Sequence, residues 1–223
     1  MAIALRTNFD IRQVIGDLDI VGGSSFPALT QPTCEQLVAE AMTYQFTPRQ
    51  RKFEKSKVFQ EVSGFDDFPS TSLFFAIRDC WQRILAEKFS DPLIQSPVFC
   101  TPLQFNELSL QRYEVGSWGI TPHLDPASCI NLICLFTLVG NCRFAICTDR
   151  DSHRYKDRVD RCSIELDARP GNVILLRAPG YRGSLFRPLH MVTDIKGPRI
   201  SFGLRQRITS PSHPSTTPTR EQP

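Results

Sequence analysis

The chain has 223 residues, of which 41% are hydrophobic and 22% are charged, and its formal net charge is +3. This length and composition are typical of one globular domain with a well-buried core. The small positive charge neither requires nor excludes a polyanionic partner such as nucleic acid.

Targeting segments and the positions of the cysteines bear on the cellular compartment of the protein. No segment approaches the length of a membrane span, and residues 1–10 lack an apolar core of signal-peptide length. The eight cysteines include no CxxC pair, and several lie in apolar runs, which favours buried free thiols over a zinc site or a disulfide framework. We therefore expect a protein of the reducing cytoplasm with no membrane partner.

Residues 1–100 predict a mixed, largely helical support. Thr30 and Pro32 are typical of a helix start. Ser70 is expected to cap a longer helix, whose apolar side chains recur on one face as far as Phe89. We expect these helices to cover a sheet.

A basic run extends from Arg49 to Lys57 and contains one aromatic residue, Phe53. We interpret it as a solvated loop, because the aromatic content is low and no wider basic stripe accompanies it. The alternative is a patch that binds nucleic acid or an anionic substrate.

After Pro102 the sequence consists of short β-rich runs separated by turn residues. The predicted strands are residues 105–115, 120–125, 130–138, 142–148, 163–167, 172–178, 185–193 and 199–207. Eight short strands suit a double-stranded β-helix, or jelly roll. We expect a mainly β fold with bracing helices (α+β), with N-terminal helices on one sheet and a jelly-roll core over residues 101–207, in a single domain over residues 1–207.

Two loops are expected at the mouth of this barrel. Residues 148–163 carry dense mixed charge, which favours a hairpin loop or lid over a strand. The turn that follows strand 172–178 lies shortly before His190, and Arg177, Tyr181 and Arg182 in it are candidate substrate contacts. Residues 208–223 are rich in Ser, Thr and Pro and predict a disordered tail.

The chemistry is expected to centre on His123 and Asp125. They are two residues apart, so on an extended segment both side chains point to one face and can share a metal ion. His190 supplies a third ligand if a later strand lies beside the first. Two histidines and one carboxylate leave three positions of an octahedral ion open for substrate chemistry.

A second group follows on the last predicted strand. Strict alternation puts Arg199, Ser201 and Arg205 on the face opposite Ile200, Phe202 and Leu204. A guanidinium and a hydroxyl two residues apart form a clamp for a carboxylate. Arg205 is a candidate contact for substrate or for an acidic neighbour, and the alternative is a surface charge at the end of the strand.

This pattern resembles the Fe(II)- and 2-oxoglutarate-dependent oxygenases over about residues 108–207. The residues that carry the resemblance are Tyr113 and Gly116, His123-x-Asp125, His190, and Arg199-x-Ser201. The resemblance implies that His123, Asp125 and His190 form the catalytic site and hold Fe(II), with 2-oxoglutarate and O2 as co-substrates. It also implies that Arg199 and Ser201 bind the distal carboxylate of 2-oxoglutarate and that Tyr113 donates a hydrogen bond to it.

The resemblance further implies an oxidation of a substrate C–H bond, with release of succinate and CO2. Halogenating members replace the carboxylate ligand with a small residue, so Asp125 favours hydroxylation. The compact chain and the arginines near the mouth favour a small anionic or amino-acid-like metabolite as substrate.

Two alternatives remain open. The basic run and the Tyr113-x-x-Gly116 segment suggest a nucleobase or protein side-chain oxygenase or demethylase. A non-catalytic barrel that binds metal or 2-oxoglutarate as a sensor is the second, although an intact triad and clamp argue against it.

Overall fold

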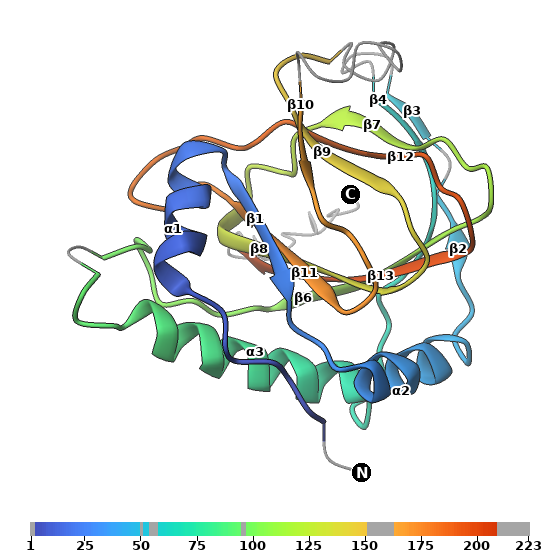
Figure 1. The fold of residues 1–223 in the computed structure, drawn as a ribbon. Helices are drawn as coiled ribbons and strands as arrows, with labels where there is room; N and C mark the ends of the chain where they lie inside the picture. Colours follow the sequence, from blue (N-terminus) through green and yellow to red (C-terminus); the bar gives the residue numbers. More distant parts are fainter. Residues whose placement is uncertain (1–2, 50, 54–57, 95–96, 151–162, 209–223) are drawn as a thin grey trace, which may run out of the picture.

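The computed structural model describes residues 3–49, 51–53, 58–94, 97–150 and 163–208. Two antiparallel sheets face each other, and helices pack beneath one of them (Figure 1). No helix in the described ranges is long and apolar enough to cross a membrane. Most of the expected lid, residues 151–162, and the expected disordered tail from residue 209 lie outside the described residues.

Two short helices precede the first long one. Helix α1 (Ile11–Ile20) begins at Asp10, whose carboxylate accepts hydrogen bonds from the backbone N–H groups of Arg12 and Gln13. Helix α2 (Gln31–Ala41) begins at Thr30 with a proline in its first turn, which confirms the start predicted from the sequence.

Helix α3 (Leu73–Phe89) begins at Ser72, so the predicted cap at Ser70 is wrong. The hydroxyl of Ser72 accepts from the backbone N–H of Phe74, and a carboxylate oxygen of Glu40 accepts from that of Leu73. Glu40 lies on α2, so the second capping group comes from a distant part of the chain. The predicted apolar stripe is confirmed, and its fully buried residues are Phe74, Ile77, Trp81 and Leu85.

The major sheet has seven strands in the order β1-β11-β8-β13-β6-β5-β2. Their bounds are β1 (Gly23–Pro27), β2 (Thr47–Pro48), β5 (Ser63–Phe65), β6 (Glu107–Tyr113), β8 (Cys129–Val139), β11 (Asn172–Arg177) and β13 (Arg199–Arg207). One face packs on the helices, and Ile200, Phe202 and Leu204 of β13 belong to that core. The alternation predicted for this strand is thereby confirmed, because the opposite face carries Arg199 and Ser201.

The minor sheet has six strands in the order β10-β9-β12-β7-β4-β3. Their bounds are β3 (Arg51–Phe53), β4 (Val58–Glu61), β7 (Gly119–His123), β9 (Arg143–Cys147), β10 (Ser163–Leu166) and β12 (His190–Thr193). The basic run was predicted to be a loop, and for residues 51–53 this is wrong. These residues pair with β4 at the edge of the sheet, a position where charged residues are common in strands.

The two sheets enclose a second apolar core. Ile133 and Ile174 from the major sheet meet Phe144 and Val192 from the minor sheet there. Among the described residues no strand pairing joins one sheet to the other. The mainly β architecture with helices on one sheet is confirmed, whereas hydrogen bonds do not close the expected barrel.

Candidate metal centre

His123 and His190 face each other on neighbouring strands of the minor sheet. They are direct partners in the antiparallel pairing of β7 and β12, and their ring centroids are 4.3 Å apart. Asp125 follows β7, and its Oδ2 atom lies 3.3 Å from Nε2 of His190. One ligand atom from each of the three residues lies within 4.8 Å of the others. The structure thus brings together the three residues predicted from the sequence.

Both imidazole rings are oriented by backbone carbonyls. Nδ1 of His123 lies 3.0 Å from the carbonyl oxygen of Thr121, and Nδ1 of His190 lies 3.0 Å from that of Pro188. A carbonyl oxygen only accepts, so in each ring Nδ1 carries the proton and donates it. In a neutral ring Nε2 is then left with its lone pair, as in histidines that ligate metals.

The surroundings favour the metal-binding protonation states of His123 and Asp125. Burial and the neighbouring His190 lower the pKa of His123 to about 3, which favours the neutral ring. Burial raises the pKa of Asp125, but Arg205 and the two histidines lower it more, so that it falls to about 2. At neutral pH the site presents one carboxylate and a neutral His123.

These three acceptors fit a bound cation better than they fit one another. Oδ2 of Asp125 is buried without a hydrogen-bond donor, even though Nε2 of His190 is 3.3 Å away. Two lone pairs at that distance do not stabilise each other, whereas a divalent ion between them satisfies both. The nitrogen and oxygen donor set suits Fe(II), and His123, Asp125 and His190 are the residues that could hold it.

Arg205 lies directly against the acidic member of the cluster. Its Nε donates to Oδ1 of Asp125 over 3.3 Å, and its Nη1 donates to the hydroxyl of Ser109 over 3.1 Å. Nη1 also lies 3.8 Å from Glu107. Arg205 was expected to touch either substrate or an acidic neighbour, and the structure places it on the acidic neighbour.

Arg199 is buried farther along the same face of β13. It is 2% exposed, and its Nη2 donates to the hydroxyl of Thr137 over 3.3 Å. Its Nε has no hydrogen-bond partner, and the structure gives it no acidic partner among the described residues. A buried guanidinium without a counter-ion is costly, so this position is suited to an anion.

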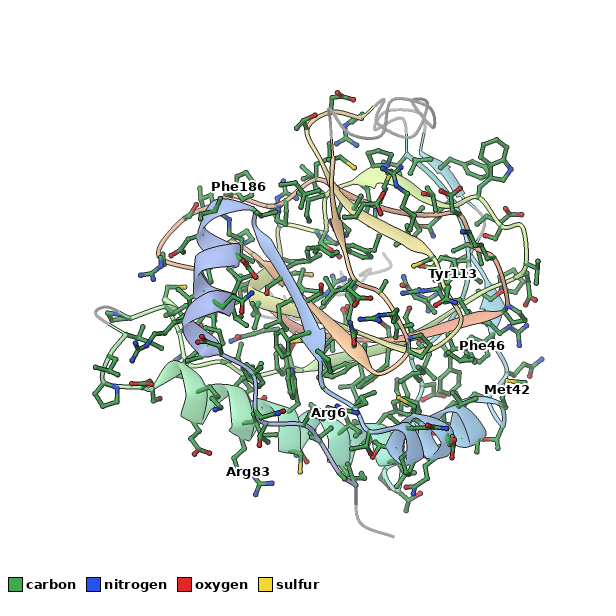
Figure 2. All side chains as sticks on the ribbon, viewed as in Figure 1. Arg6, Met42, Phe46, Arg83, Tyr113 and Phe186 are labelled. Atoms are coloured by element: carbon green, nitrogen blue, oxygen red, sulfur yellow. The ribbon has the colours of Figure 1, made fainter. Side chains whose placement is uncertain are left out.

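Tyr113 and Gln111 stand opposite this arginine and its neighbouring serine. In the pairing of β6 and β13, Tyr113 faces Arg199 and Gln111 faces Ser201. The guanidinium carbon of Arg199 lies 5.2 Å from the centre of the Tyr113 ring, and the Tyr113 hydroxyl donates to Gln111 over 3.0 Å. Tyr113 lies in the space between the sheets (Figure 2), where burial raises the pKa of its hydroxyl and keeps it protonated.

The three candidate substrate contacts of the turn after β11 lie in different surroundings. Arg177 lines a small cavity that also contacts Asp125 and His190. Tyr181 is buried, and its ring packs edge-on against Phe99. Arg182 pairs with Asp19 over 2.9 Å. Neither Tyr181 nor Arg182 lines the cavity beside the cluster.

Four side chains that the structure brings to these groups were not predicted from the sequence. They are Ser109, Gln111, Thr137 and Arg187. Gln111 carries a usable signal, since it precedes Tyr113 by two residues and therefore shares its face. Ser109 shares the same alternation, whereas the contacts of Thr137 and Arg187 depend on which segments become neighbours in the fold, which no local pattern specifies.

No protein-family model matches this chain. No curated protein matches it either. Solved structures do resemble it. A 2OG-Fe(II) oxygenase family oxidoreductase from Burkholderia pseudomallei aligns with a TM-score of 0.62 at 13% identity, covering 89% of this chain and 91% of the other.

Two further solved structures that resemble the chain are of enzymes described with different activities. A prolyl-4-hydroxylase from Pseudomonas putida aligns with a TM-score of 0.58 at 14% identity, covering 89% of this chain and 99% of its own. SnoN, described as a non-heme alpha ketoglutarate dependent epimerase from nogalamycin biosynthesis, aligns with a TM-score of 0.57 at 16% identity over 87% and 81% of the two chains. The chain thus has the fold of the 2OG-Fe(II) oxygenases, and its His123, Asp125 and His190 fit their HxD…H triad.

Proposed function

We propose that this protein is an Fe(II)- and 2-oxoglutarate-dependent dioxygenase that hydroxylates a C–H bond of a small, anionic or amino-acid-like substrate. The observation that carries the proposal is that the same fold holds, among the described residues, two groups with buried atoms that lack a hydrogen-bond partner, the three acceptors of the metal cluster and the guanidinium of Arg199. A cluster of three acceptors requires a cation, and the buried Arg199 requires an anion.

Each protein group has a separate role in this proposal. His123, Asp125 and His190 hold Fe(II), and their common side leaves its other positions open. Arg199 and Ser201 bind the distal carboxylate of 2-oxoglutarate, with the buried Tyr113 hydroxyl as a hydrogen-bond donor. The Tyr113 hydroxyl has a single proton, which Gln111 accepts in this structure, so donation to the co-substrate carboxylate requires that proton to turn from Gln111 to the ligand.

The bound Fe(II) supplies the redox chemistry with O2 and 2-oxoglutarate. The overall reaction is R–H plus O2 plus 2-oxoglutarate to R–OH plus succinate plus CO2. Both atoms of O2 are thereby accounted for, one in the new hydroxyl and one in succinate. The protein positions the reactants and keeps the carboxylate ligand ionised through Arg205.

Anaerobic titration of the purified protein with Fe(II) and 2-oxoglutarate tests the proposal. Joint binding of both gives a weak visible metal-to-ligand charge-transfer band in wild type. We expect His190→Ala to abolish the band and Arg199→Ala to require far more 2-oxoglutarate. The matched control is Arg83→Ala, because Arg83 projects outward from α3 (Figure 2), and α3 packs on the major sheet whereas the two histidines lie on the minor sheet. Absence of the band in folded wild type would refute the proposal.

A second candidate is oxidation of a protein side chain, and the likeness to prolyl hydroxylases supports it. Unstructured polypeptides and small metabolites, screened side by side for stimulated succinate release, separate the two substrate classes. A nucleobase substrate requires salt-sensitive binding to a random oligonucleotide, and its absence at low salt removes that alternative.

The sensor alternative differs in turnover. A catalytic site consumes 2-oxoglutarate slowly even without substrate, whereas a pure sensor binds it and leaves it intact. Succinate formation by the Fe(II)-loaded protein, compared with that of His190→Ala, distinguishes them.

A further inference from the structure

The clearest unexplained feature beside the metal cluster is a small cavity with two arginines in its wall. Asp125 and His190 contribute to this cavity, together with Arg177 and Arg187. Its enclosed part is only about 10 Å³, the space of one water molecule, so a larger ligand would meet the partly exposed arginines at the mouth of the cavity rather than inside it. The cavity therefore joins two cationic side chains directly to two of the candidate metal ligands.

Neither arginine is neutralised by a carboxylate within the described part of the chain. Nη1 of Arg187 donates to the backbone carbonyl of Asp125 over 2.7 Å. Nη1 of Arg177 donates to the backbone carbonyl of Asp19 over 3.3 Å, while its Nε is buried without a partner. The neighbouring Arg182, in contrast, is paired with the carboxylate of Asp19. Two guanidinium groups that have no carboxylate partner among the described residues thus lie at one wall of the cavity.

The rest of the surroundings are apolar and partly exposed. Ile133 and Leu176 line the inner side of the cavity. The guanidinium of Arg177 stacks on the ring of Phe186, with its carbon 4.0 Å from the ring centre. Phe186 lies near the end of α1 at the surface (Figure 2), and it is 46% exposed. Partly exposed arginines beside an apolar wall suit a small ligand with one anionic group.

This cavity lies at the other end of the strands from Arg199. Arg199 bonds to Thr137 and packs against Gly140, near the end of β8. The cavity instead meets Cys129 and Ile133, which pair with Arg207 and Arg205. The six-residue separation of Arg199 and Arg205 corresponds to about 20 Å of strand. The two anion positions are therefore distinct.

We propose that Arg177 and Arg187 form the substrate subsite and bind a carboxylate or phosphate group of the molecule that is oxidised. This inference rests on the proposed function, since it uses the same metal cluster. Because the two arginines share one small cavity with Asp125 and His190, the oxidised carbon lies within a few bonds of the anionic group. The substrate is thus a small molecule with a carboxylate or phosphate group, and it is oxidised at a carbon close to that group.

The test uses protein loaded with Co(II) and saturated with 2-oxoglutarate, so that the Arg199 position is filled. Inorganic phosphate and acetate serve as probes, and paramagnetic broadening of the phosphorus signal or of the acetate methyl signal reports binding near the metal. We expect both probes to bind, and the tighter one identifies the charged group. Arg177→Gln and Arg187→Gln should each weaken binding at least about tenfold, because a charge-assisted contact is lost.

Controls separate this subsite from the metal site. Arg83→Gln, an exposed change on α3, should bind the probes as wild type does, and Arg177→Lys should retain part of the affinity. The cobalt absorption band is recorded for every variant to show that the metal site is intact. One glutamine variant with a normal band is enough to test the subsite. A normal band with no broadening in wild type, or with unchanged binding in the glutamine variants, overturns the subsite alone. No cobalt band in folded wild type overturns the proposed function and the subsite together.

Discussion

Arg205 donates from Nε to Oδ1 of Asp125 over 3.3 Å, so a partly buried guanidinium holds one oxygen of the carboxylate and leaves Oδ2 facing His190. The guanidinium is itself fixed, because Nη1 of Arg205 donates to the hydroxyl of Ser109. Ion pairs then continue from Arg205 to Glu107 and from Glu107 to Arg207. The orientation of Asp125 therefore depends directly on Arg205 of β13, which Ser109 of β6 holds in place, whereas Arg207 reaches it only through Glu107.

Replacing Arg205 by glutamine should weaken metal binding by about 10- to 100-fold, the usual effect of losing a group that orients a ligand. Titration with Co(II) measures the affinity. Arg207→Gln is the matched control, since it removes an ion pair with Glu107 and leaves the contact with Asp125 in place. Equal affinities of the two variants would contradict the orienting role.

Gly140 should control 2-oxoglutarate binding through the position of Arg199. Gly140 has a φ of +81°, and a Cβ atom there would lie 2.3 Å from the carbonyl oxygen of Pro198 and 2.7 Å from Cα of Arg199. Gly140→Ala must therefore displace the start of β13. We expect at least tenfold weaker 2-oxoglutarate binding, measured by the charge-transfer band, with Fe(II) binding retained.

Gly183→Ala supplies the control for backbone strain. Gly183 also has a positive φ, +68°, but a Cβ atom there would meet nothing within 4 Å. If both alanine variants lose 2-oxoglutarate affinity equally, strain and not the displacement of Arg199 is the cause.

Many of the strands of the two sheets could be predicted from the sequence because strand signals are local. Each of the eight expected runs after residue 102 contains or overlaps a strand, and the face assignment of β13 is correct. The start of α3 could not be predicted with the same accuracy. Its caps come from Ser72 and from Glu40 on another helix, and the second contact arises only in the folded chain.

The candidate site likewise has contacts that follow from local spacing and contacts that arise only in the folded chain. His123 and Asp125 share a face by their spacing alone, and His190 joins them once β12 pairs with β7. The partner of Arg205 was not specified, because Asp125 and Arg205 are 80 residues apart and lie on different parts of the fold. Arg187 could not be predicted for a similar reason, since it contacts the cluster through the backbone carbonyl of Asp125.

The close approach of β7 and β12 depends on Gly119. With a φ of +69°, it is so close to β12 that a Cβ atom would lie 1.9 Å from the carbonyl oxygen of Val192. Gly119→Ala should separate the strands that carry His123 and His190, abolish metal binding, and destabilise the protein by several kcal/mol. Urea unfolding and Co(II) titration check both effects.

The control for Gly119 is Gly16→Ala. Gly16 lies inside α1, and a Cβ atom there meets nothing within 4 Å. Alanine at a helix interior position of this kind is expected to stabilise by roughly 0.5–1 kcal/mol. Similar losses of stability in both variants would show that the close approach at Gly119 is unimportant.

The stability of the metal-free protein should fall with pH below about 6.5, and His123 should be one cause. Its pKa is about 3 in the folded chain, against 6.5 for an unperturbed histidine, because burial and His190 disfavour the charged ring. Between these values the unfolded chain binds a proton that the folded chain does not, so unfolding becomes more favourable as the pH falls. The slope from this group is at most about 1.4 kcal/mol per pH unit.

Urea unfolding at pH 7 and pH 5 in the presence of a chelator measures this dependence, and His123→Gln should reduce it because glutamine does not titrate. Asp125 adds to the loss only at lower pH, since its pKa falls from 3.8 to about 2 on folding. An unchanged pH dependence in His123→Gln would show that the ring is not held neutral by burial. Because the same burial leaves Nε2 unprotonated, that result would also weaken the case for a preformed metal site.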